Sequence, residues 1–259
     1  MSKVIVFSNQ KGGVAKTTSA IMTAGNLISR DKKVLIVDAD PQCNSSNFMV
    51  ETFDEISDDH PTLFELIFDG ELSIEDSIVK GTSFGDVIIG SRKLWDMDRA
   101  DTDPLVLREI IDEVRDEYDY VIIDTPPHLG WLQLASLAAA DYVVIPTDAD
   151  NMSVQNIPYL YNTIENTKKL NDALQIAGIL FTRVETRGSG LRVEKQIISD
   201  MQEYADEMNI KVFNTKIRAA KTPLGESSLT HQNIFMRGRK HKVKEDYEQF
   251  VTELLEVVG

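Results

Sequence analysis

The sequence predicts an α/β fold in which a doubly wound, mostly parallel sheet carries helices on both of its faces. Short continuous apolar runs at residues 3–8, 33–38 and 119–124 alternate along the chain with longer amphipathic segments. Apolar runs of this kind are typical of parallel strands covered on both faces, and strand–helix alternation builds such sheets. At 259 residues the chain can bury one large core, so a single domain over residues 1–259 is expected.

The same alternation extends through most of the chain. Apolar runs predict strands near residues 3–8, 33–38, 86–89, 119–124, 141–146, 176–182 and 212–217. Helical periodicity predicts helices near residues 16–30, 61–68, 103–117, 129–139, 153–169, 189–208 and 241–257. Residues 48–85 are rich in acids and irregular, and are expected to form small helices at the domain edge.

The most informative segment directly follows the first strand. Residues 8–18 read Ser-Asn-Gln-Lys-Gly-Gly-Val-Ala-Lys-Thr-Thr, and a helix is expected to begin near Lys16. A glycine-containing loop between a strand and a helix points backbone N–H groups at a polyphosphate. Lys16 would reach the β- and γ-phosphates, and the Thr17 hydroxyl would ligate Mg²⁺. The residues expected to hold the nucleotide are Lys11, Gly12, Gly13, Val14, Ala15, Lys16, Thr17 and Thr18.

Lys11 and Ala15 distinguish this loop from the ordinary phosphate-binding pattern. With Lys11, the loop resembles the deviant Walker A signature, K-G-G-x-G-K-T/S, of the ParA/MinD ATPases among the P-loop NTPases. The resemblance implies that Lys11 reaches across a dimer interface to the nucleotide of the other subunit, and that Lys11 and Lys16 both serve catalysis. Ala15 replaces a glycine of that signature. Its methyl group is expected to crowd the phosphates or restrict the loop dihedrals, and so to slow hydrolysis.

Carboxylates end two further buried strands. Asp38 and Asp40 follow the run at 33–38, and Asp124 ends the run at 119–124. Ligands of parallel sheets bind beyond the carboxyl ends of the strands, so these side chains can converge on one nucleotide. By the resemblance, Asp124 is the Walker B carboxylate that holds Mg²⁺ through water, Asp40 orients or activates the attacking water, and Asp38 supports the metal side. The alternative is that Asp38 and Asp40 only cap the next helix.

Charge is unevenly distributed along the chain. The formal net charge is −15, yet residues 211–244 hold nine basic residues against one acidic residue, Glu226. A concentrated basic segment in an acidic protein predicts one polyanion-binding face, with contact that depends strongly on salt. The alternative is a basic loop that neutralises acidic neighbours or the nucleotide.

The resemblance covers nearly the whole chain and is strongest to the ParA/Soj partition ATPases. It implies that Arg183 lies in a loop at the nucleotide site, and that Ile217, Arg218 and Ala219 belong to a segment wrapping the adenine. Where the family usually shows Pro-Arg-Asn, this chain has Ile-Arg-Ala, so backbone contacts to the base are expected. The expected DNA contacts are Arg187, Arg218, Lys221, Arg237, Arg239 and Lys240.

These features together predict an ATP-dependent partition ATPase that binds ATP or ADP with Mg²⁺ and segregates a plasmid or a chromosome. The family resemblance implies an ATP-dependent homodimer that binds DNA without sequence preference. It also implies a centromere-binding partner of the ParB type, whose basic N-terminal peptide stimulates hydrolysis. A cytoplasmic, nucleoid-associated protein is expected, with no membrane partner.

Two alternatives remain. A MinD-like positioning ATPase would bind membrane through a basic amphipathic C-terminal helix, whereas residues 245–256 here are amphipathic but acidic. A nucleotide-gated binding protein with little turnover is the second alternative, because Ala15 would allow binding without fast hydrolysis.

Overall fold

The computed structural model of the chain describes residues 1–56, 58–69, 72–99, 102–186, 191–220 and 222–259. Arg187 and Lys221, two of the expected DNA contacts, lie outside the described residues.

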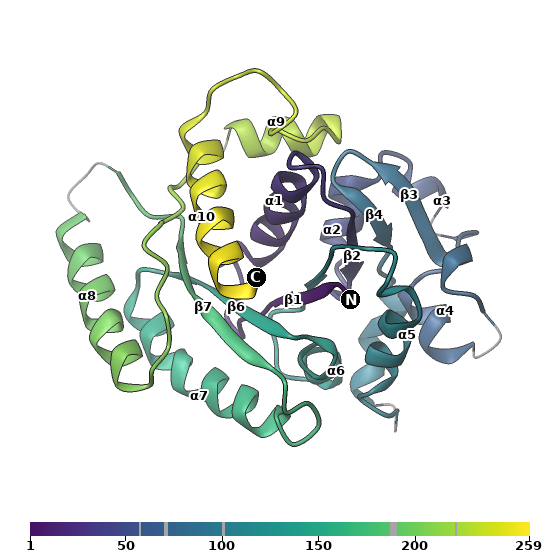
Figure 1. Ribbon diagram of the computed structural model, residues 1–259, viewed down its shortest axis with the longest axis horizontal. Coiled ribbons are helices and arrows are strands. Elements are labelled where there is room, and N and C mark those ends of the chain that lie inside the picture. The colour runs from purple at the N-terminus through teal and green to yellow at the C-terminus, as the bar shows by residue number, and fades with distance from the viewer. Residues whose placement is uncertain (57, 70–71, 100–101, 187–190, 221) are drawn as a thin grey trace.

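A seven-stranded sheet runs through the described part of the chain (Figure 1). Its strands are β1 (Lys3–Phe7), β2 (Val34–Asp38), β3 (Ile78–Thr82), β4 (Gly85–Ile88), β5 (Tyr120–Asp124), β6 (Tyr142–Asp148) and β7 (Gln175–Thr182). The spatial order is β3-β4-β2-β5-β1-β6-β7, and every pairing is parallel except that of β3 with β4. Because β2, β5 and β1 are adjacent, their polar carboxyl-terminal residues meet at one edge of the sheet.

Helices cover both faces of the sheet. The helices α1 and α10 lie together on one side of the sheet, and α6 and α7 lie on the other (Figure 1). The longer helices are α1 (Lys16–Ile28), α5 (Val106–Val114), α6 (Trp131–Ala139), α7 (Asn151–Thr167), α8 (Leu191–Glu207), α9 (Thr222–Thr230) and α10 (Lys242–Val258). The shorter ones are α2 (Asn44–Met49), α3 (Phe53–Ile56), α4 (Leu63–Phe68), η1 (Glu75–Ser77) and η2 (Arg92–Arg99). The doubly wound α/β prediction is therefore confirmed.

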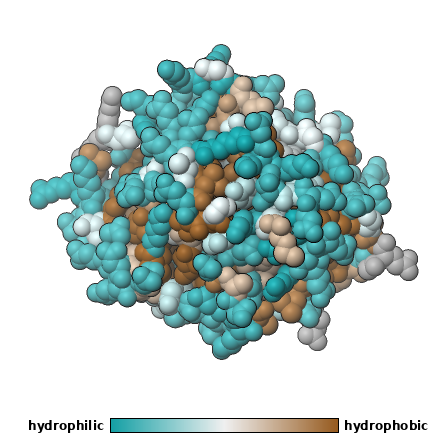
Figure 2. Space-filling view, viewed as in Figure 1, coloured by the Kyte–Doolittle hydropathy of each residue, from teal (hydrophilic) through white to brown (hydrophobic). Residues whose placement is uncertain are grey.

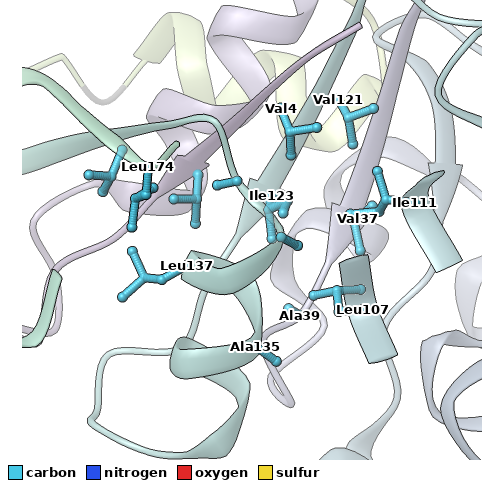
Figure 3. Close-up of a cluster of buried hydrophobic side chains, with 14 of the residues drawn as sticks. Val4, Val37, Ala39, Leu107, Ile111, Val121, Ile123, Ala135, Leu137 and Leu174 are labelled. Atoms are coloured by element: carbon cyan, nitrogen blue, oxygen red, sulfur yellow. The ribbon is translucent and has the colours of Figure 1, made fainter. Parts of the chain in front are cut away.

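Two apolar cores hold the helices to the sheet. Alternate residues of each strand enter opposite cores, so that Leu35 and Val37 of β2 face one and Val34 and Ile36 face the other. In the first core, Val4, Val37, Val121 and Ile123 of the central strands meet side chains of α5 and α6 (Figure 3). The surface in the view of Figure 2 is mostly hydrophilic, with apolar residues in scattered patches. Among the described residues, no helix has both the length and the apolar character needed to cross a membrane.

Four elements differ from the sequence-based expectations. The edge strand β3 lies within residues 48–85, where only small helices were expected, and the helices η2 and α9 were not predicted. The expected strand at 212–217 is absent; isolated bridges join Ile179 to Val212 and Val184 to Arg218. Here the Glu253 carboxylate accepts hydrogen bonds from the backbone N–H groups of Asn214 and Thr215, each at 2.8 Å. These two N–H groups are therefore unavailable for a strand ladder.

Candidate nucleotide site

The loop between β1 and α1 forms a cradle with two residues in the left-handed region. Gly13 has φ 78°, and Ala15, the residue before α1, has φ 57° and ψ 33°. The loop is fixed from outside, since the Thr182 hydroxyl donates to the Val14 carbonyl at 3.0 Å and Arg183 donates to the Gly13 carbonyl at 2.6 Å. The sequence predicted that alanine would restrict the dihedrals at position 15. The left-handed backbone there is a conformation that costs a residue with a side chain about 1–2 kcal/mol.

Lys16 lies inside this cradle and is only 6% exposed. Its Nζ donates to the carbonyl oxygen of Lys11 at 3.1 Å, so the ammonium faces the concave side of the loop. Burial lowers the pKa of Lys16, and the carboxylates of Asp124 and Asp40 act in the opposite direction. A phosphate oxygen in place of the Lys11 carbonyl would give the buried ammonium a stronger, charge-assisted acceptor.

Asp124 at the end of β5 is fully buried with one oxygen available. Its Oδ2 accepts from the Ser45 hydroxyl at 2.5 Å, whereas its Oδ1 has no hydrogen-bond partner among the described residues. Burial raises the pKa of Asp124 to about 6, although hydrogen bonds from Ser45 and Thr17 favour its charged form. Mg²⁺ prefers carboxylate and hydroxyl oxygens and keeps part of its water shell. The unpartnered Oδ1 and the adjacent Thr17 hydroxyl are oxygen donors that fit such an ion.

Asp38 and Asp40 have different surroundings. The Oδ2 of Asp38 accepts from the backbone N–H of Ser46 at 2.8 Å and from its hydroxyl at 2.6 Å, and Oδ1 accepts from the N–H of Asp40 at 3.2 Å. Burial and the charge of Asp124 raise the pKa of Asp38 to about 7. Asp40 is 5% exposed, and its Oδ1 accepts from the N–H of Gln42 at 2.9 Å. Asp38 therefore organises this turn, where it receives the N–H of Asp40 and both donors of Ser46.

Lys11 lies at the rim of the cradle, bound to the start of α7. Its ammonium donates to Asp150, with the Ser153 hydroxyl at 3.2 Å and the Asp148 carboxylate at 4.0 Å. Asp150 also caps α7 by accepting from the N–H of Ser153 at 2.8 Å. Partial burial raises the pKa of Asp150, but the bonds from Lys11 and Ser153 outweigh this and leave the pKa below its ordinary value. Lys11 is thus held within its own subunit.

The predicted adenine segment packs beside the loop. Ile217 donates its N–H to the Phe181 carbonyl at 2.8 Å, and Ala219 donates to the Val184 carbonyl at 3.1 Å, so both residues lie next to the end of β7. Arg183 bridges this region to the cradle, because its guanidinium contacts both the Gly13 carbonyl and, at 3.1 Å, Asp148. The Arg218 guanidinium makes two bonds, at 2.6 and 2.5 Å, to Asp246 of α10. The Arg218 guanidinium, which was expected to contact the nucleotide or DNA, is therefore engaged with Asp246.

The other expected DNA contacts that are described lie on the loop between α9 and α10. Arg239 and Lys240 are exposed, and Arg237 is partly buried against Thr230 and Gln232. Arg239 is 3.5 Å from Glu226, an exposed pair of little energetic value.

Comparison with known proteins identifies the family of the chain. Residues 2–176 match the AAA_31 family, described as an AAA domain. The chain is 35% identical over 225 residues to the chromosome-partitioning ATPase Soj of Treponema pallidum, covering 84% of this chain and 83% of that protein. It belongs to the Soj/ParA family of partition ATPases. It is also 32% identical to the sporulation initiation inhibitor protein Soj of Bacillus subtilis, covering 86% of this chain and 88% of that one.

Solved structures extend the likeness beyond the Soj/ParA relatives. Apo McdA of Cyanothece superposes with a TM-score of 0.82 at 26% identity, covering 98% of this chain and 100% of that chain. Cobyrinic acid a,c-diamide synthase of Mycobacterium smegmatis, solved with ADP and magnesium, gives a TM-score of 0.82 over 99% of this chain and 95% of that chain. At 23% identity, the latter shows a shared fold alone.

Several residues of this candidate site could not be singled out from the sequence. Ser45 and Ser46 bind the two buried carboxylates, while Asp148, Asp150 and Ser153 surround Lys11. The serines follow the Asp-x-Asp motif by only a few residues, and nothing in their spacing marks them as partners of Asp38 and Asp124. A signal existed for the aspartates, because Asp148 and Asp150 form a second Asp-x-Asp at the carboxyl end of a buried strand.

Proposed function

We propose that this chain is an ATP-driven partition ATPase that segregates a plasmid or a chromosome. The observation that carries the proposal is the convergence of Lys16, Thr17 and the unpartnered Oδ1 of Asp124 on one loop, with Lys11 at its rim. Membership of the Soj/ParA family supports the same role.

Each residue has a role that follows from its position. Lys16 would exchange the Lys11 carbonyl for β- and γ-phosphate oxygens, and Thr17 and Asp124 would hold Mg²⁺. When bound there, the ion would supply positive charge that neutralises the phosphates during transfer. Asp40 orients the attacking water. Asp38 supports the metal side of the site indirectly, since it accepts hydrogen bonds from the Ser46 hydroxyl and from the backbone N–H of Asp40. The segment 217–219 closes over the adenine through its backbone.

Lys11 links the nucleotide to assembly. In the closed homodimer, Lys11 of each subunit leaves Asp150 and binds the nucleotide of the other subunit. Dimer formation places two basic loops, with Arg237, Arg239 and Lys240, on one surface that binds nucleoid DNA through its phosphates. A centromere-bound partner of the ParB type, carrying a basic N-terminal peptide, stimulates hydrolysis and releases the DNA.

The test is duplex DNA binding measured without nucleotide, with ADP and with ATP, using two unrelated sequences. Binding is expected only with ATP and equally for both duplexes, because one basic loop in a chain of net charge −15 reaches too few phosphates. Changing Arg237, Arg239 and Lys240 together to alanine should flatten the dependence of log K on log salt, by up to about 0.9 for each phosphate that is no longer neutralised. Strong binding by the nucleotide-free protein would refute the proposal.

The left-handed backbone at Ala15 favours a second candidate, a nucleotide-gated binder with little turnover. Phosphate release measured with DNA and with a basic partner peptide separates the two. A partition ATPase is stimulated by these additions, whereas a gated binder releases phosphate at the same low rate with or without them.

A further inference from the structure

The last helix, α10, contacts two separate parts of the candidate nucleotide site through consecutive residues, Asp246 and Tyr247. One part is the segment 217–219, called here the base half, and the other is the phosphate loop with the first turn of α1, called the phosphate half. Consecutive residues of a helix point about 100° apart, so adjacent positions can reach different neighbours. Because α10 packs against α1, it lies between the two halves (Figure 1).

Asp246 holds the base half. Its carboxylate accepts hydrogen bonds from the Arg218 guanidinium at 2.6 and 2.5 Å and from the Arg218 backbone N–H at 3.1 Å. The residues on either side of Arg218, Ile217 and Ala219, are bonded to Phe181 and Val184 at the end of β7. The position of this segment is therefore set jointly by β7 and by α10.

Tyr247 holds the phosphate half. Its hydroxyl lies 3.2 Å from the hydroxyl of Ser19, and both residues are fully buried. Ser19 is in the first turn of α1, and its backbone N–H donates to the Ala15 carbonyl at 2.9 Å. Burial raises the pKa of Tyr247, so its hydroxyl stays uncharged and the bond to Ser19 is a neutral one. The turn that carries Lys16 and Thr17 is thus joined to α10.

The pair of hydroxyls is not required for packing. Tyr247 belongs to the apolar core that contains Ile5 and Phe7, where phenylalanine would fill the same space as the tyrosine ring. A buried hydroxyl is costly unless it is bonded, and a bonded pair allows fewer arrangements of its two helices than apolar contact does. The bond between Tyr247 and Ser19 therefore fixes where the first turn of α1 lies relative to α10.

We propose, on the basis of the function proposed above, that α10 couples the base half to the phosphate half and that Tyr247 positions the phosphate loop. Without the bond to Ser19, the loop would hold its binding conformation for a smaller fraction of the time, and nucleotide affinity would fall by that fraction. Since Asp246 is the preceding residue of the same helix, a nucleotide that orders one half also orders the other.

The experiment measures the affinity of the full chain for Mg-ADP by isothermal titration calorimetry. Tyr247→Phe should weaken binding by about threefold to tenfold, which corresponds to the loss of one neutral hydrogen bond. Ser19→Ala should weaken binding by the same factor. The double variant should bind no more weakly than either single variant, because both changes remove the same bond.

The matched control is Tyr118→Phe. It removes a tyrosine hydroxyl that donates to Asp86 at 2.9 Å, before the amino end of β5 and away from the phosphate loop. Both tyrosine variants should lose stability in urea, whereas only Tyr247→Phe should lose affinity for ADP. Equal affinities of the two variants would show that Tyr247 has a structural role alone, and would overturn the proposal.

The coupling is tested by combining Tyr247→Phe with Asp246→Asn. If α10 acts as one unit, the loss of ADP affinity in the double variant should be at least about twofold smaller than the product of the two single losses. Losses that multiply would mean that the two residues act independently, and would overturn the coupling. A chain that binds no ADP would refute the nucleotide site itself. These assays contain no DNA and no partner, so a failure of DNA binding would leave their result unchanged.

Discussion

At the residue scale, the backbone of Ala15 is where sequence and conformation conflict. Its left-handed conformation is one that glycine adopts without cost, and the Soj/ParA signature has glycine at this position. The sequence indicated a restriction at residue 15. The sequence did not indicate that Ala15 would adopt a positive φ while the loop kept its shape. The loop is held by hydrogen bonds that Val14 and Gly13 accept from Thr182 and Arg183, which are distant in the sequence.

We expect Ala15→Gly to raise the free energy of unfolding by about 1 kcal/mol. Relief of left-handed strain contributes about 1–2 kcal/mol, and the greater freedom of glycine in the unfolded chain offsets part of it. Urea denaturation without nucleotide measures this, and ATP turnover should rise while ADP affinity stays nearly unchanged. Ala20→Gly within α1 is the control and should lower stability. A drop in turnover for Ala15→Gly would show that the loop is adapted to alanine.

The contact of Lys11 with Asp150 leads to a second prediction at this scale. Asp150→Asn keeps the cap of α7, because asparagine caps as well as aspartate, but removes the charge that holds Lys11. The protein concentration giving half-maximal dimer with ATP should therefore fall severalfold, since the monomer no longer has this competing interaction. Sedimentation velocity measures it. A higher concentration requirement would mean that Asp150 serves the dimer rather than the monomer.

At the scale of elements, α10 holds in place the segment 217–219, which we propose closes over the adenine. Asp246, whose side chain is 8% exposed, receives the Arg218 guanidinium and also the Arg218 N–H at 3.1 Å. Asp246→Asn should lower the free energy of unfolding by about 2 kcal/mol and weaken ATP binding, because it removes charge-assisted bonds to a buried group. Arg239→Ala breaks an exposed pair instead and should change stability by at most about 0.5 kcal/mol. Equal effects of the two changes would contradict this role of α10.

The central strands and the long helices could be predicted because each carries its own periodic apolar signal. The edge strand β3 could not, since one of its five residues is buried and, within the described part of the chain, it pairs with β4 alone through an irregular register. The region 212–217 has the composition of a strand. However, the carboxylate of Glu253, which is 38 residues from Thr215 in the chain, accepts hydrogen bonds from the N–H groups of Asn214 and Thr215. The convergence of Asp38, Asp40 and Asp124 was predictable, because parallel strands end at the same edge of the sheet. The partners of Lys11 were not predictable in this way, because they depend on β6 being the neighbour of β1 in the sheet.

At the scale of the whole molecule, opposite charges occupy different parts of the surface. The loop before α10 exposes Arg239 and Lys240, whereas α10 itself exposes the carboxylates of Glu245 and Glu256. We expect a chain of net charge −15 to bind DNA weakly as a monomer, so the proposed function depends on assembly. In the proposed function Lys11 leaves its own subunit to join another, so we expect assembly to depend on Lys11 more than on any other residue named above.

Light scattering with saturating Mg-ATP on two hydrolysis-blocked variants tests that claim most directly. Asp40→Ala should bind ATP and persist as a dimer, since its attacking water is no longer positioned, so the mass should double from 29.1 kDa. Asp40→Ala/Lys11→Ala should bind ATP and remain at the mass of one chain. A double variant that still dimerises, or a single variant that stays monomeric while saturated with ATP, would contradict the assignment of Lys11 as the residue that joins the two subunits.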